Sequence, residues 1–138
     1  MQKLIVISID SLTDDDIKRA GCTPNISYLI DHGTYIKNIN GIYPSLTHPC
    51  HATIITGQNP GVHGIISNKD YSLPNHPWFN SLSDIKCETV VDVFKRNGAS
   101  IACCRWPVTA GGFEKIDYLI PEITNENDIK NDCLGHYL

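Results

Sequence analysis

A threonine at position 47 stands at the start of an apolar segment. The range 47–56 carries Pro49 in its first turn and ends before Gly57, which predicts a buried helix that begins at Thr47. Backbone N–H groups and the helix dipole at such a start favour an incoming phosphoryl oxygen, so Thr47 is a candidate nucleophile. The alternative is an ordinary N-cap, which is the commoner role for threonine.

Three histidines follow Thr47 closely in the sequence. His48 and His51 share a helical face at a spacing of three residues, and His63 comes soon after them. An HxxH pair is compatible with a metal site. Without a third ligand or an acid in the pattern, however, hydrogen bonding at the helix start is the simpler interpretation.

A carboxylate follows the first apolar segment of the chain. Asp10 comes directly after the β-branched run 4–9, which predicts a buried parallel strand. The carboxyl end of a parallel sheet is where α/β folds place their ligands, so Asp10 is a candidate metal or substrate ligand. The acidic run 14–16 that follows also fits a plain exit from a strand into a solvated helix start.

Strands and helices are expected to alternate along the chain. Strands are predicted over 4–9, 34–39, 99–104 and 116–120, and helices over 23–33, 47–56, 88–97 and 125–134. The first of these helices should start with a Thr23 cap. The proline-rich range 70–83 is predicted to be an irregular surface excursion that could cover a site. The alternation predicts an α/β fold with a mainly parallel sheet and helices on both faces.

Composition excludes several classes of protein. The chain has 138 residues and a formal charge of -4, with no long Lys/Arg cluster, so binding to nucleic acid is not expected. No apolar run approaches the ~20 residues of a membrane span, and the N-terminus lacks the features of a signal peptide. These observations predict no membrane partner and a cytoplasmic location. The six cysteines contain no CxxC pair and are expected to be reduced.

An ordered series of motifs runs along the chain. It comprises SID at 8–10, TPN at 23–25, YPSLTHPCH at 43–51, TGQNPGVHGI at 56–65, SN at 67–68, CRWPVTAGG at 104–112 and IPE at 120–122. This series resembles the type I phosphodiesterase/nucleotide pyrophosphatase family of the alkaline phosphatase superfamily. The resemblance covers residues 3 to about 122, and its most specific part is 43–51 with the block that follows.

The resemblance implies a function and a set of site residues. Carried over by position, Asp10 is a metal ligand, Thr47 is both nucleophile and metal ligand, and Asn68 donates to the phosphoryl oxygen. The family implies two divalent metal ions, Zn²⁺ in the first instance, and a small phosphorylated substrate. The expected reaction is hydrolysis of phosphoric diesters or nucleotide pyrophosphate bonds through a phospho-threonine intermediate. The fold implied is the alkaline-phosphatase-like core.

The chain departs from the family pattern at several positions. Ser11 stands where relatives often have glycine, Cys50 replaces an asparagine, and His48 replaces an aromatic residue that can stack on a base. The Asp and His ligands that relatives supply later in a longer domain do not appear. The range 1–138 is therefore expected to be the N-terminal part of a catalytic domain, inactive by itself. Alternatives are a related phosphonate, sulfate or phosphomonoester hydrolase, or a catalytically silent α/β fragment.

Overall fold

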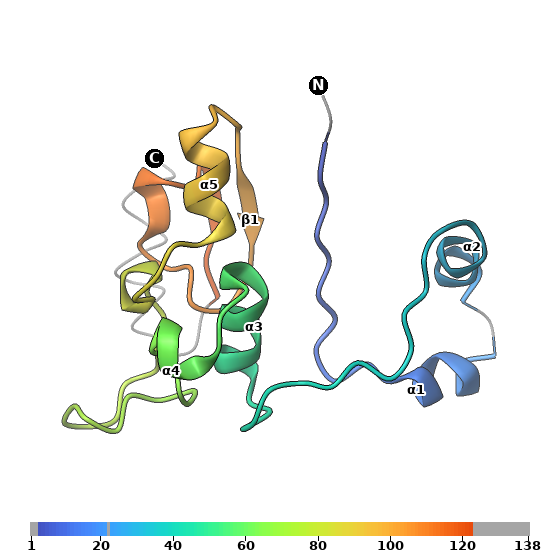
Figure 1. Cartoon of the computed structure of the whole chain (residues 1–138), viewed down its shortest axis with the longest axis horizontal. Coiled ribbons are helices and arrows are strands. Elements are labelled where there is room, and N and C mark those ends of the chain that lie inside the picture. The colour runs from blue at the N-terminus through green and yellow to red at the C-terminus, as the bar shows by residue number, and fades with distance from the viewer. Residues whose placement is uncertain (1–2, 22, 123–138) are drawn as a thin grey trace. The chain divides into compact units, whose positions relative to one another are not determined.

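The computed structural model describes residues 3–21 and 23–122. The chain divides into two compact units, Met1–Asn40 and Gly41–Leu138. The first unit contains α1 (Asp14–Arg19) and α2 (Pro24–His32). The second contains, in order along the chain, α3 (Thr47–Thr56), α4 (Pro60–His63), η1 (Leu82–Asp84), α5 (Val90–Arg96), β1 (Ala102–Cys104), η2 (Gly112–Glu114) and β2 (Tyr118–Ile120) (Figure 1).

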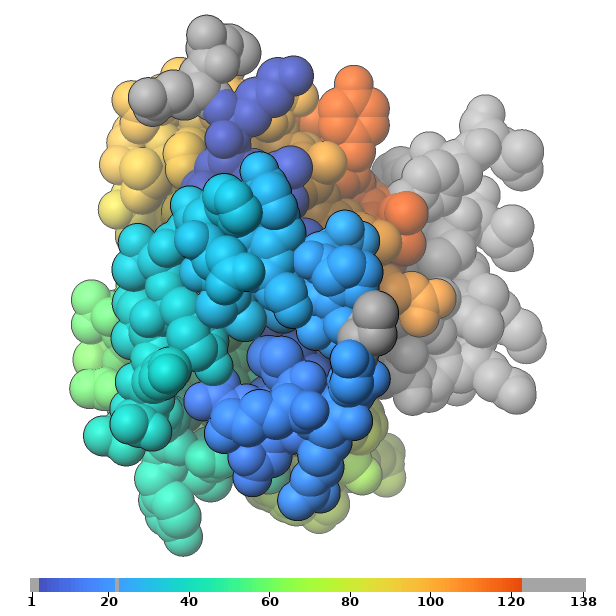
Figure 2. Space-filling view, turned by 90° about the vertical axis from the view of Figure 1, so that its right-hand side faces the viewer, coloured from blue at the N-terminus to red at the C-terminus, as the bar shows by residue number. Residues whose placement is uncertain are grey.

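The first unit has two helices and an extended N-terminal segment. Residues 4–9 run extended without pairing to a described strand, and Ile5 and Ile7 are 81% and 77% exposed. The strand prediction is therefore not confirmed for this segment, because a strand needs a hydrogen-bonded neighbour. Residues 34–39 are irregular instead of forming the expected strand. Figure 2 shows the surface of this unit in blue to cyan.

The helix starts of the first unit are built in two ways. Thr13 and Asp16 form a capping box at α1, in which Asp16 Oδ2 accepts from the Thr13 backbone N–H at 2.9 Å. The predicted helix at 23–33 is confirmed as α2, with Pro24 as its first residue. Thr23 is the cap residue, as expected, but its side chain makes no cap hydrogen bond.

The second unit holds the buried core of the described residues. The predicted helix 47–56 is confirmed as α3, and Gly57 ends it with a φ of 65°, a left-handed conformation that favours glycine. Ala52 of α3 packs with Ile65 and Val108 in one apolar cluster. A second cluster joins η1, α5 and β2 through Leu82, Val91, Ile116 and Leu119. These clusters hold α3 and β2 in place.

Two strands form a parallel sheet. β1 pairs with β2 in the register Ala102↔Tyr118, Cys103↔Leu119 and Cys104↔Ile120. The mixed α/β class, the parallel direction and the strands predicted within 99–104 and 116–120 are confirmed. The described sheet has two strands, smaller than the one expected with helices on both faces. The helix predicted at 125–134 lies outside the described residues.

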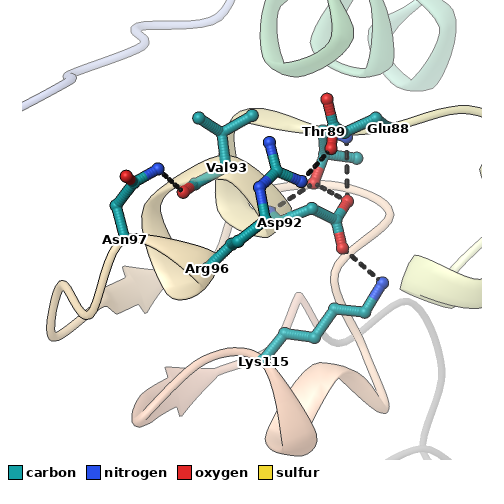
Figure 3. Close-up of polar contacts among 7 residues, drawn as sticks. All are labelled: Glu88, Thr89, Asp92, Val93, Arg96, Asn97 and Lys115. Carbon is teal, nitrogen blue, oxygen red and sulfur yellow. Dashed lines mark hydrogen bonds and ion pairs between the residues drawn. The ribbon is translucent and has the colours of Figure 1, made fainter.

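Polar side chains secure α5 at its start (Figure 3). Thr89 and Asp92 form a capping box, with Asp92 Oδ2 accepting from the Thr89 backbone N–H at 2.8 Å. Lys115 Nζ lies 2.5 Å from the second carboxylate oxygen of Asp92. Partial burial acts to raise the pKa of Asp92, but the bonds from Lys115 and Thr89 outweigh it and lower the pKa to about 2. The polar groups at the start of α5 thus find their partners in Thr89, Asp92 and Lys115.

Candidate active site

Thr47 occupies the first helical position of α3, and the cap position belongs to Leu46. Leu46 has the extended φ and ψ of a cap residue (−102° and 153°), and it makes no side-chain cap hydrogen bond. The N-cap interpretation of Thr47 is therefore wrong. The threonine side chain is half-buried and begins a helix whose first turn contains no acidic residue. A hydroxyl at this position is placed at the positive end of the helix dipole.

Asn68 is held directly beside this helix start. Its Oδ1 accepts a hydrogen bond from the backbone N–H of His48 at 3.0 Å. Because the oxygen of the carboxamide is used in this way, the N–H groups on Nδ2 are the donors that the side chain presents elsewhere. The two residues expected to act on the phosphoryl group, Thr47 and Asn68, thus meet at one end of α3. The hydrogen bond between His48 and Asn68 that brings them together spans 20 positions of sequence.

A narrow hairpin fixes the backbone of Asn68. The Asn68 carbonyl accepts from the Phe79 N–H at 3.0 Å, and the Asp70 N–H donates to the Pro77 carbonyl at 2.7 Å. Lys69 and Trp78 form an antiparallel bridge between these bonds. The excursion 70–83 is therefore closed at its base, beside the candidate site. Its Trp78 packs against the His48 ring, with 5.2 Å between ring centroids.

His48 follows the candidate nucleophile and points into the protein. Only 2% of the residue is exposed, and Nε2 lies 3.6 Å from Oε2 of Glu122. Burial lowers the pKa of the His48 imidazole, and the nearby His51 lowers it further. The Asn68 side chain acts to raise this pKa, but burial has the larger effect. The buried ring offers no open face for a base to stack on. Sequence reasoning assigned no role to Trp78 or Glu122, and only the placement of Glu122 in a family motif marked it.

The other two histidines have structural partners. His51 Nδ1 lies 2.8 Å from the Thr47 carbonyl, and its ring meets Trp106 edge to face. The Ile65 N–H donates to His63 Nδ1 at 3.1 Å, so the proton of this neutral ring is on Nε2, 3.0 Å from the Thr53 hydroxyl. Burial lowers the pKa of His63. These contacts support the hydrogen-bonding interpretation of the histidines.

Metal ligands form no complete set in the described part of the chain. No group of three His, Cys, Asp or Glu side chains there is arranged to hold an ion. The oxygens of Asp10 and Thr47 are suitable donors for Zn²⁺, but one zinc ion takes about four ligands. These residues fit the role of two ligands in a larger set. Asp10 belongs to the first unit, and its role as a ligand stays a prediction.

Ser11 preserves the turn that follows Asp10. Its φ is 60°, the left-handed conformation in which glycine is favoured. The serine that departs from the family pattern therefore adopts a glycine-like backbone.

None of the described helices is both long and apolar enough to cross a membrane. The cytoplasmic location stays a prediction.

Known proteins match this chain over most of its length. A pyrophosphatase/phosphodiesterase of Schizosaccharomyces pombe, named as uncharacterized, is 32% identical over 113 residues, covering 75% of this chain and 23% of that protein. Human ectonucleotide pyrophosphatase/phosphodiesterase family member 1 is 34% identical over 110 residues, covering 75% of this chain and 12% of that protein. The rat member 1 is 51% identical over 51 residues, 37% of this chain and 6% of the rat protein.

The chain therefore spans less than a quarter of the length of these relatives. The names of the relatives are those of hydrolases that act on pyrophosphate and phosphodiester bonds. The model of the type I phosphodiesterase/nucleotide pyrophosphatase family matches residues 4–132, almost the whole sequence. On this match and these identities, the chain belongs to the type I phosphodiesterase/nucleotide pyrophosphatase family, a family of hydrolases.

Proposed function

We propose that the complete protein hydrolyses phosphoric diesters or nucleotide pyrophosphate bonds, with Thr47 as the nucleophile. The observation that carries the proposal is the geometry at the start of α3. Thr47 stands at the first helical position without serving as the cap, and Asn68 is bonded to the next backbone N–H. A nucleophile and a donor to the phosphoryl oxygen need to be close in this way.

The proposed reaction has two displacements at phosphorus. Thr47 Oγ loses its proton and forms a bond to phosphorus, and the leaving alcohol or phosphate departs with the electron pair of the broken P–O bond. Water then attacks phosphorus in the phospho-threonine and loses a proton. The P–O bond to Thr47 Oγ breaks with its electron pair, Oγ takes up a proton to restore the hydroxyl, and the phosphate product leaves. In both steps Asn68 Nδ2 donates to a phosphoryl oxygen as negative charge develops there.

Asp10 and Thr47 are the residues of this chain that would hold a divalent cation, Zn²⁺ in the first instance. When bound, such a cation lowers the pKa of an oxygen ligand and compensates negative charge on the phosphoryl group. The proposal requires further ligands outside Asp10 and Thr47, since two side chains do not satisfy two zinc ions.

The substrate class follows from the family and from His48. Small phosphorylated compounds or nucleotides are the substrates proposed. The buried His48 ring does not supply a stacking surface, so a nucleobase would need another contact.

Acid quenching of the complete protein during turnover tests the proposal. The substrate is bis(p-nitrophenyl) phosphate, and mass spectrometry of peptides should find an added p-nitrophenyl phosphoryl group on Thr47, because the first displacement expels only one of the two p-nitrophenolates. A parallel assay compares this diester with p-nitrophenyl phosphate, p-nitrophenyl sulfate and a phosphonate monoester. Faster turnover of one of the latter three would favour the related hydrolases. A phosphoryl group on another residue, or on none, would overturn the role of Thr47.

A further inference from the structure

A buried imidazole without hydrogen bonds stands next to the candidate nucleophile. Neither Nδ1 nor Nε2 of His48 forms a hydrogen bond with the described residues, although the side chain is almost completely buried. A buried polar group that lacks a partner destabilises a protein by ~1–3 kcal/mol. An apolar ring of similar size would avoid this penalty. The polarity of His48 therefore calls for a role that an apolar ring does not fill.

Glu122 is the acidic group that faces the His48 ring. It follows β2 in the chain, and its Oε2 lies 3.6 Å from His48 Nε2. A neutral imidazole carries one proton, and with that proton on Nε2 the ring would donate to Glu122 after a closer approach of less than 1 Å. Trp78 packs on the same ring. The imidazole is thus placed between the hairpin base and the end of the sheet.

The backbone of His48 connects this ring to both residues proposed to act on the phosphoryl group. Thr47 directly precedes His48 in the chain. The backbone N–H of His48 donates to the Asn68 carboxamide oxygen at 3.0 Å. Any rotation of the peptide at His48 would therefore move the Thr47 hydroxyl and release Asn68. A displacement of about 1 Å in such a site lowers rates about a hundredfold.

We propose that Glu122 is a positioning residue: it orients the His48 imidazole and so fixes the start of α3, on which the placement of Thr47 and Asn68 depends. This inference rests on the proposed function of Thr47 and Asn68. Glu122 itself touches neither the substrate nor the reacting atoms. Its effect is expected on turnover, because the groups that it positions act in the displacement and not in the initial binding.

Two variants of the complete protein separate positioning from bulk stability. Glu122→Gln keeps an oxygen that accepts from Nε2–H, whereas Glu122→Leu removes it. With bis(p-nitrophenyl) phosphate, Glu122→Leu should lower kcat about tenfold with KM unchanged, and Glu122→Gln should stay within about twofold of the natural protein. Glu114→Leu, at an exposed position in η2, is the control for the lost charge and should leave both parameters unchanged.

A double-mutant cycle tests whether Glu122 acts through His48. His48→Phe keeps a ring and removes Nε2, so Glu122→Leu should add no further loss of kcat in that background. Additive losses would overturn the proposal. So would variants that lower the melting temperature while kcat stays unchanged at a temperature where they are folded.

A measurement on the His48 ring itself does not depend on activity. In the complete protein labelled with ¹⁵N-histidine, the imidazole ¹⁵N shifts should report a proton on Nε2, and Glu122→Leu should change them. A proton on Nδ1 would contradict the proposal even where Glu122→Leu fails to fold. Turnover by Thr47→Ala at the natural rate would instead overturn the proposed function. Loss in Thr47→Ala with full activity in Glu122→Leu would overturn only the positioning role.

Discussion

The backbone N–H groups at two helix starts in the second unit find their hydrogen-bond partners in different ways. At α5 the capping box of Thr89 and Asp92 provides partners from within the same turn, and Lys115 adds an ion pair (Figure 3). At α3 the cap residue is Leu46, and the partner of the first turn is Asn68, brought in from a separate segment. The start of α5 is therefore satisfied by side chains that have no proposed part in the reaction. The start of α3 instead depends on a side chain that is also proposed to act in the reaction.

Replacing Thr47 should have the largest effect. In the complete protein, Thr47→Ala removes the proposed attacking oxygen, so turnover of a diester should fall by at least about a thousandfold. The free energy of unfolding should change by no more than about 1 kcal/mol, because Thr47 is the first helical residue and the cap is Leu46. Steady-state assays and chemical denaturation measure the two quantities. Retained turnover would move the nucleophile to another residue.

Replacing Asn68 should affect catalysis and stability together. Asn68→Ala removes the donor to the phosphoryl oxygen, which should lower kcat about 10²–10³-fold. It also leaves the His48 N–H at the start of α3 without its acceptor, which should cost about 1 kcal/mol of stability. The matched variant is Thr89→Ala, which should cost a similar stability through the α5 cap with no change in kcat. Equal effects of both variants on kcat would remove the contrast between the two helix starts.

The acid stability of the α5 start follows from Asp92. Its pKa is lowered to about 2 from an ordinary value of 3.8, so the carboxylate stabilises the folded state above pH 3.8. This contribution, at most about 2 kcal/mol, should disappear as the pH falls from 3.8 toward 2. Denaturation of the natural protein and of Asp92→Asn across this range should give unfolding curves that converge at the acid end. A gap that stays constant would mean that Asp92 does not titrate as described.

The smallest effect is expected before α1, a third helix start. Ser11 has a φ of 60°, so Ser11→Gly should raise the free energy of unfolding by up to about 1 kcal/mol. Ala20→Gly, at a right-handed position after α1, is the control and should not stabilise. Denaturant titration of both variants gives the comparison.

Local signals in the sequence predicted much of the second unit. The bounds of α3, its end at Gly57 and the parallel strands were predicted, because periodicity and helix-ending residues act within a few positions. The bond from Asn68 to His48 was not predictable from such signals, since it joins residues 20 positions apart. The family motifs contain both His48 and Asn68, whereas the contact between these two residues depends on the fold.

The first unit was harder to predict. A run such as 4–9 shows β propensity, but the hydrogen bonds of a strand come from a partner that the run itself does not specify. The caps show the same limit, since Thr23 has the preferred residue type without the cap bond, whereas Thr89 has both. Residue type alone therefore predicts too much regular structure where the hydrogen-bond partner comes from another part of the chain.

The closed base of the hairpin has a consequence for how relatives of this protein diverge. Hydrogen bonds at Asn68–Phe79 and Asp70–Pro77 join the two ends of the excursion, so the distance between those ends does not depend on how many residues lie beyond them. Entropy of loop closure rises only slowly with length, so insertions or deletions between 71 and 76 should be tolerated. The tip of this hairpin is therefore a place where evolution can vary length and chemistry while Asn68 keeps its position.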